Sequence, residues 1–217
     1  MPIRINLRIV YKIFGEVMKG MDLMKYFEKK DSTREEILKI SREIVRDCAM
    51  NIRHVQKMKR DEISFEVVEK LKKLEELTEE YYDFGKYLNL PQQEYVEFQV
   101  FYSIVFEGRY LDYHELEVEV KPENYVLGIC DVVGELRRMV LESIKKDDIE
   151  SAERYYKFME KIYDEVIKYD YYYVIEGLRK KQDICRGILE KTYGDIVTFV
   201  ENLKLRKELE KQREIKD

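Results

Sequence analysis

Residues 95–106 have the sequence YVEFQVFYSIVF, a helix-forming run with almost no polar side. Pro91 precedes this run and suits the first position of a helix, where its missing N–H would have no partner anyway. A helix that is apolar nearly all round has to be covered by other elements on every side. The chain is therefore predicted to fold around a buried helix that begins at Pro91 and ends near Gly108.

Helical spacing of apolar residues predicts further helices before and after this one. Only three Pro and nine Gly occur in 217 residues, and no Gly/Ser-rich linker divides the chain, so a single helical domain is favoured. The segment DYHELEVEV after Gly108 alternates like one short strand, and one strand cannot form a sheet. We expect helices over residues 32–59, 62–87, 91–108, 122–146, 149–168 and 172–210.

The two ends of the chain differ from its middle. Residues 1–30 are mildly basic and amphipathic, and are predicted to form an N-terminal arm or an extra helix without an assigned role. Residues 31–203 would form the helical domain, and the charged residues 204–217 a helical tail that frays into solvent. No apolar run reaches the roughly 18 residues that a membrane span needs, and the three cysteines form no CxxC pair. These features favour a cytoplasmic protein without a membrane anchor, a disulfide framework or a zinc site.

A row of basic residues, called here the basic stripe, follows one face of the first long helix. Residues 32–60 contain eight Lys or Arg against four Asp or Glu, in a chain whose net charge is −5. An exposed helix face ordinarily mixes both signs, because pairs spaced i,i+4 stabilise it slightly. A row of one sign suits the phosphate backbone of a nucleic acid, and a merely solvated face is the alternative. The basic stripe consists of Lys39, Arg42, Arg46, Arg53, Lys57 and Arg60.

Two pairs of carboxylates lie within apolar helical segments. Glu94 and Glu97 are three residues apart, and Asp131 and Glu135 are four apart in YVLGICDVVGELRRM, so each pair shares one helix face. Glu94 alone could be an acid that favours the positive end of a helix dipole. Asp131 and Glu135 could belong to a polar stripe that faces water. Glu97 is harder to explain, because a buried carboxylate needs a partner, either a base or a metal.

A divalent cation is the natural counter-charge if the two helices pack together and the four carboxylates converge. Oxygen ligands alone suit Mg²⁺, with Mn²⁺ as a substitute. A di-iron site in a helical bundle needs Glu-x-x-His, and neither His54 nor His114 completes that motif. The sequence also lacks the GxxxxGK[ST] and GxGxxG loops that bind nucleotides.

Three segments resemble the translin family, in particular its translin-associated factor X (TRAX) members: REEILKISREI, QEYVEFQVF and YVLGICDVVGELRRM. The resemblance covers about residues 32–203. It implies an all-α subunit, a single-domain bundle of about seven helices, that assembles into a hollow oligomer. It also implies that Glu94, Glu97 and Asp131 bind Mg²⁺ and carry endoribonuclease activity, with Glu135 as a fourth ligand or a general base.

The predicted function is therefore that of a Mg²⁺-dependent endoribonuclease, a hydrolase that holds RNA on the basic stripe and cleaves it inside a translin-like oligomer. The resemblance implies RNA or single-stranded DNA as partner, and either a homo-octamer or a separate translin-like subunit. The alternatives are a non-catalytic RNA- or single-stranded-DNA-binding module and a structural helical protein with salt-bridged carboxylates. A tyrosine cluster could stack on bases, or could pack at a helix junction or subunit contact. It comprises Tyr169, Tyr171, Tyr172 and Tyr173.

Overall fold

The structure is a computed structural model that describes residues 22–214. These residues form six α-helices and no strand, which confirms the all-α prediction. Four short 3-10 or π turns, η1 to η4, connect or extend the helices. The α-helices are α2 (Leu23–Gln56), α3 (Val67–Glu79), α4 (Asn89–Tyr102), α5 (Pro122–Lys145), α6 (Ile149–Val166) and α7 (Leu178–Glu214).

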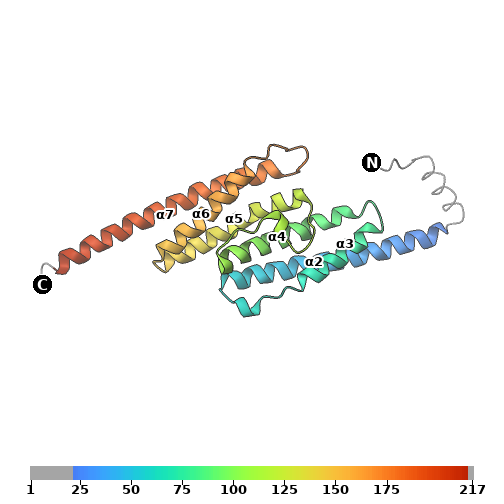
Figure 1. Ribbon diagram of the computed structural model, residues 1–217, viewed down its shortest axis with the longest axis horizontal. Coiled ribbons are helices and arrows are strands. Elements are labelled where there is room, and N and C mark those ends of the chain that lie inside the picture. The colour runs from blue at the N-terminus through green and yellow to red at the C-terminus, as the bar shows by residue number, and fades with distance from the viewer. Residues whose placement is uncertain (1–21, 215–217) are drawn as a thin grey trace.

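Helix α4 lies at the centre of the bundle, as its apolar sequence predicted. It packs between α2 and α5, while α3 covers α2 and both α6 and α7 pack against α5 (Figure 1). The backbones of α4 and α5 approach closely at Gly128. A Cβ atom added there would lie 2.7 Å from the backbone oxygen of Gln93 and 2.8 Å from the Cβ of Val96. The fully buried aromatic residues of α4 are Tyr95, Phe98 and Phe101.

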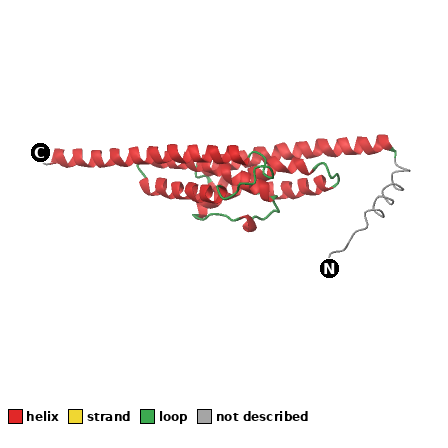
Figure 2. Ribbon diagram, turned by 90° about the horizontal axis from the view of Figure 1, so that it is seen from above, coloured by secondary structure: helices red, strands yellow, loops and turns green. Residues whose placement is uncertain are grey.

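The two longest helices extend beyond the bundle at opposite ends. Helix α2 has 34 residues and α7 has 37, so each is more than about 50 Å long at a rise of 1.5 Å per residue. The N-terminal part of α2 and the C-terminal part of α7 project on either side (Figure 2). Phe27 on the first projection and Leu205 on the second expose more than half of their surface. None of the described helices combines the length and the apolar character that crossing a membrane requires.

Several helix boundaries differ from the predicted ones. Helix α2 begins at Leu23 instead of residue 32, because Asp22 caps it by accepting a hydrogen bond from the backbone N–H of Met24 and no Gly or Pro interrupts the next turns. The predicted strand is absent from the described residues, although Val118 and Val120 point into the core as its alternation implied. Helix α7 begins only at Leu178, so the tyrosine cluster lies in the loop between α6 and α7.

The predicted division of the chain at residues 30/31 and 203/204 stays a prediction. Helix α2 runs through the first of these boundaries without a break, and α7 runs through the second. Most of the predicted arm, residues 1–21, lies outside the described residues.

Candidate functional site

Glu94 and Glu97 are positioned by α4. This helix begins at Asn89, two residues before the predicted start, and no acidic residue lies in its first turn. Glu94 therefore belongs to the second turn, where the helix dipole explains it poorly. Both side chains are partly buried, and no ion pair or side-chain hydrogen bond among residues 22–214 ends on either carboxylate. Glu97 is thus partly buried, and the partner that the sequence predicted for it is not found among the described side chains.

Asp131 and Glu135 follow the close approach at Gly128 by about one and two turns of α5, so they lie beside α4. The side chain of Glu135 is only 15% exposed, which is too little for a stripe that simply faces water. Its carboxylate accepts a hydrogen bond from Gln56 Nε2 at the end of α2, and Arg138 Nε lies 3.7 Å from the same oxygen. The packing of α2 against α5 therefore holds one oxygen of the Glu135 carboxylate in place.

The charges of neighbouring carboxylates act on Glu94 and Glu97. Burial raises the pKa of Glu97 to about 8, and the negative charges of Asp131, Glu94 and Glu135 add to the effect. Burial and the charge of Asp131 likewise raise the pKa of Glu94. The predicted site residues of the two helices therefore lie near enough for their charges to act on Glu94 and Glu97, and the four are called here the acidic cluster.

Lys181 on α7 supplies a positive charge to the acidic cluster. Its Nζ donates to Asp131 Oδ2 at 2.5 Å and to the backbone oxygen of Leu127 at 2.9 Å, and lies 3.5 Å from Gln93 Oε1. The charge of Lys181 also opposes the rise in the pKa of Glu97. The sequence pattern did not reveal this residue, because it lies 50 positions beyond Asp131. One signal was present: Lys181 stands between Leu178 and Cys185 on a helix face that is otherwise buried.

The acidic cluster has the oxygen ligands that suit a magnesium site, but its side chains are not arranged around one point as a bound ion would require. Carboxylate oxygens are the protein ligands that Mg²⁺ prefers, and their mutual repulsion is what a divalent cation would relieve. In the described part of the chain, no three His, Cys, Asp or Glu side chains are grouped so that they could hold a metal ion. The predicted ligand set therefore stays a prediction.

The basic stripe is exposed along its whole length. Helix α2 carries four of its six members, Lys57 caps the helix, and Arg60 lies in the following turn η1 (Arg60–Glu62). None of the six forms an ion pair with another described residue, whereas Lys70 and Lys73 of the neighbouring α3 pair with Asp47 and Glu36 of α2. The Arg60 guanidinium lies over the rings of Tyr102 and Phe106. The charges of the stripe are therefore available to an external anion.

A groove lies at the C-terminal end of the basic stripe, and no carboxylate of the acidic cluster is among its lining residues. Its volume is about 810 Å³, and it runs between the C-terminal ends of α2 and α5. Gln56 and Arg138, the two side chains that contact Glu135, line it. The remaining charged lining residues are Lys57, Lys59, Lys146 and Glu142.

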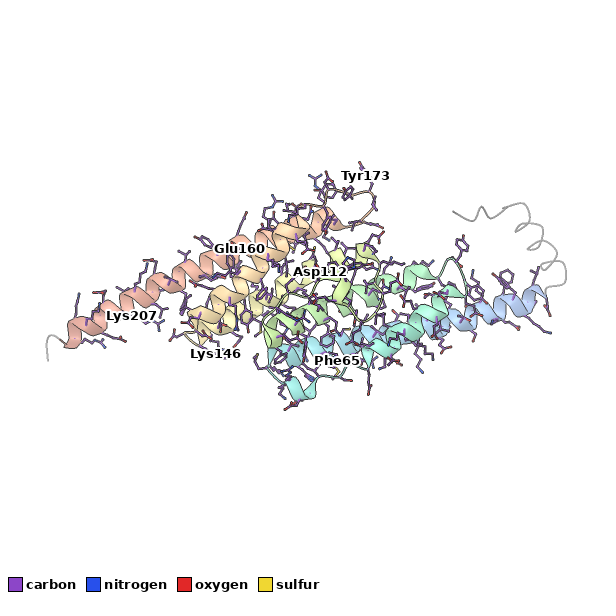
Figure 3. All side chains as sticks on the ribbon, viewed as in Figure 1. Phe65, Asp112, Lys146, Glu160, Tyr173 and Lys207 are labelled. Carbon is purple, nitrogen blue, oxygen red and sulfur yellow. The ribbon has the colours of Figure 1, made fainter. Side chains whose placement is uncertain are left out.

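Only Tyr169 of the tyrosine cluster packs against the subunit core. Tyr171, Tyr172 and Tyr173 are exposed, and Tyr173 is completely exposed at the loop tip (Figure 3). The Arg179 guanidinium lies 5.9 Å from the centre of the Tyr172 ring. A packed helix junction is therefore the wrong explanation for these three residues, and base stacking and a subunit contact remain as alternatives.

Comparisons with known proteins agree on one family. Residues 32–193 match the model of the family described as Translin family. A protein of Methanocaldococcus jannaschii described as uncharacterized is 52% identical over 194 residues, which cover 87% of this chain and 86% of the relative. The structure of AfC3PO in complex with duplex RNA is 31% identical, with a TM-score of 0.67 over 83% of this chain and 96% of that one. Apo-NeC3PO, which is 24% identical, shares the fold with a TM-score of 0.72 over 82% of this chain and 95% of its own.

Proposed function

The chain belongs to the translin family, and from this premise we propose that it binds RNA and cleaves it as a Mg²⁺-dependent endoribonuclease. RNA binding is supported by the similarity to AfC3PO, whose structure contains duplex RNA. It is supported independently by the basic stripe, whose six exposed cations form no ion pair with another described residue and match the charge of a phosphate backbone.

One observation carries the proposed cleavage: the acidic cluster is held together although burial and mutual repulsion oppose it. Keeping Glu97 partly buried among three other carboxylates is unfavourable, so a purely structural role does not account for it. Gln56 and Arg138, which contact Glu135, line a groove whose other charged residues are mainly basic, and RNA bound there would bring its phosphate backbone toward the carboxylates.

The residues have distinct roles in this proposal. Glu94, Glu97 and Asp131 would hold Mg²⁺, or Mn²⁺ in its place. The bound ion would supply an activated water and stabilise the charge that builds on the scissile phosphate. Gln56 and Arg138 engage Oε2 of Glu135, which would leave its Oε1 to accept a proton from water.

We further propose that the subunits assemble into a closed oligomer, as the family resemblance implies, either a homo-octamer or an assembly with a separate translin-like chain. A net charge of −5 opposes RNA binding to an arbitrary surface. An interior lined by the basic stripe would overcome this, because only the lining has to be positive.

The test is an RNA cleavage assay with wild-type protein and matched variants, with Mg²⁺ and with EDTA. Glu97→Gln and Asp131→Asn should each abolish cleavage and leave RNA binding unchanged. Glu150→Gln, an exposed change in the first turn of the adjacent helix α6 and outside the groove, should cleave normally. Cleavage by both cluster variants would place the active site elsewhere. RNA binding without cleavage by the wild type in Mg²⁺ or Mn²⁺ would instead support a non-catalytic RNA- or single-stranded-DNA-binding module.

A further inference from the structure

A second cavity lies away from the acidic cluster, where the N-terminal end of α5 meets the C-terminal end of α6 and the loops beside them. Its volume is about 480 Å³, within the range of about 300–1,000 Å³ that is usual for small-molecule sites. No residue of the acidic cluster or the basic stripe lines it. The cavity therefore needs an explanation other than RNA cleavage.

Aromatic rings form much of the wall of this cavity. The hydroxyl of Tyr125 donates to the backbone oxygen of Leu111, and that of Tyr113 to the backbone oxygen of Val120. Both rings are thereby held in place, 5.3 Å apart in an edge-to-face arrangement. Tyr169 and Tyr171 from the tyrosine cluster complete the aromatic lining.

The charged groups that line the cavity are all carboxylates. They are Asp112 before η4 (Tyr113–Glu115), Glu123 in the first turn of α5 and Glu165 near the end of α6. None of the three forms an ion pair with a described residue, and the nearby Arg109 pairs with Glu107 and Glu115 instead. Of the described residues, no Lys or Arg lines this space, and His114 is its only basic side chain. Such a surface repels a phosphate and attracts a cation.

A neighbouring tyrosine already accepts an ammonium group. Lys161 Nζ lies 4.6 Å from the centre of the Tyr110 ring, within the range of a cation–π contact. The hydroxyl of Tyr110 in turn contacts that of Tyr125 in the wall. A cation placed against the rings of the cavity would repeat this arrangement.

We propose that the cavity binds a linear aliphatic amine with two or more ammonium groups. Carboxylates on three separate elements would hold the ammonium groups, and the tyrosine rings with Val126 and Ile175 would cover the methylene chain between them. The aromatic and aliphatic lining favours this ligand over a hydrated Mg²⁺ ion, which is bound mainly through oxygen atoms. This binding site is independent of the proposed nuclease activity.

The test is calorimetry on the full-length, RNA-free protein with spermidine and putrescine as probes, because residual RNA would itself bind the amines. Saturable binding is expected, with hexanediol as an uncharged control that does not bind. Glu165→Gln and Tyr169→Leu should each weaken amine binding by about tenfold or more, the effect of one lost charge-assisted or cation–π contact. Circular dichroism establishes whether each variant is folded. If Tyr169→Leu does not fold, Tyr171→Leu at an exposed position takes its place.

Two control variants separate this cavity from its surroundings. Tyr173→Ser alters an exposed tyrosine outside the cavity, and Asp131→Asn alters the acidic cluster, so both should bind spermidine like the wild type. The proposal is overturned if the wild type shows no saturable binding or if the cavity variants bind as well as the wild type. It is also overturned if Asp131→Asn removes the binding, since the amine would then occupy the acidic cluster.

Discussion

At the scale of single residues, Glu97 is the group whose ionisation is least compatible with its surroundings. Its pKa is about 8 in the folded protein and near 4.5 in the unfolded chain. The folded state therefore binds this proton more tightly, and stability is lost as the pH rises from about 4.5 through about 8. In EDTA, we expect the free energy of unfolding in urea to fall over this range by an amount on the order of a few kcal/mol.

Glu97→Gln provides the control for this pH dependence, because the amide does not titrate. The variant should lose most of the slope between these two pH values, and at pH 8 it should be more stable than the metal-free wild type. Added Mg²⁺ should restore stability to the wild type at pH 8 if it binds the folded protein alone. A wild-type stability that rises over this range would contradict the environment described for Glu97.

Lys181 provides a second prediction at this scale. Lys181→Met keeps the length of the side chain but removes the cation beside Asp131, so the metal-free protein should lose about 1–2 kcal/mol of stability, a value suited to a partly exposed pair. Mg²⁺ should raise the melting temperature of Lys181→Met more than that of the wild type, because no ammonium competes for Asp131.

Two further variants are the controls for Lys181→Met. Lys181→Arg should retain part of the wild-type behaviour, and Lys180→Met, a change at the exposed neighbouring position, should resemble the wild type. Equal responses to Mg²⁺ in Lys181→Met and wild type would show that Lys181 only packs the helix.

The site residues that the sequence predicted and those that it missed differ in a simple physical way. Glu94 with Glu97, and Asp131 with Glu135, are neighbours on one helix turn, so spacing alone pairs them. Gln56 and Lys181 meet these carboxylates only through tertiary packing. A local sequence pattern does not show which distant residues will meet in the fold, and a single lysine on a buried helix face is a weak signal.

At the scale of helices, Gly128 determines how closely α4 and α5 approach. An added methyl group would lie within 3 Å of three atoms of Gln93 and Val96, so Gly128→Ala should force the helices apart and destabilise the protein by about 1–3 kcal/mol. Gly134→Ala is the matched control, because nothing lies within 4 Å of the corresponding position on the same helix. That change should be neutral or stabilise by up to about 1 kcal/mol through helix propensity. Urea unfolding measures the stability of both variants, and an equal change in the two would refute the close contact at Gly128.

Helix boundaries show where a one-dimensional pattern stops being informative. The buried helix and the positions of α5 and α6 agreed with the pattern within a few residues, because Pro, Gly and the apolar period mark them. The start of α2 was wrong because Asp31, Ser32 and Thr33 look like a cap, while tertiary packing keeps the helix intact through them. Thr33 instead donates from its side chain to Glu80.

At the scale of the whole molecule, charge is distributed unevenly. The chain is acidic overall, yet the basic stripe on α2 and the turn after it presents six cations without ion-pair partners among the described residues. Other lysines, such as Lys70 and Lys73, are paired. An acidic molecule attracts a polyanion only where its positive charges are gathered. The composition alone therefore argues against RNA binding, and the arrangement of charges argues for it.

This distribution makes the salt dependence of RNA binding a test of the whole surface. Replacing Arg42, Arg46 and Arg53 by Gln removes three phosphate contacts, so the slope of log affinity against log salt should become shallower by about 2–3. Replacing Lys204, Lys207 and Lys211 by Gln on the projecting part of α7 changes the net charge equally. Lys204 and Lys211 already pair with Glu201 and Glu208, so that slope should stay nearly unchanged. Fluorescence anisotropy across a salt series measures both, and equal slopes would mean that RNA responds to net charge and does not bind the stripe.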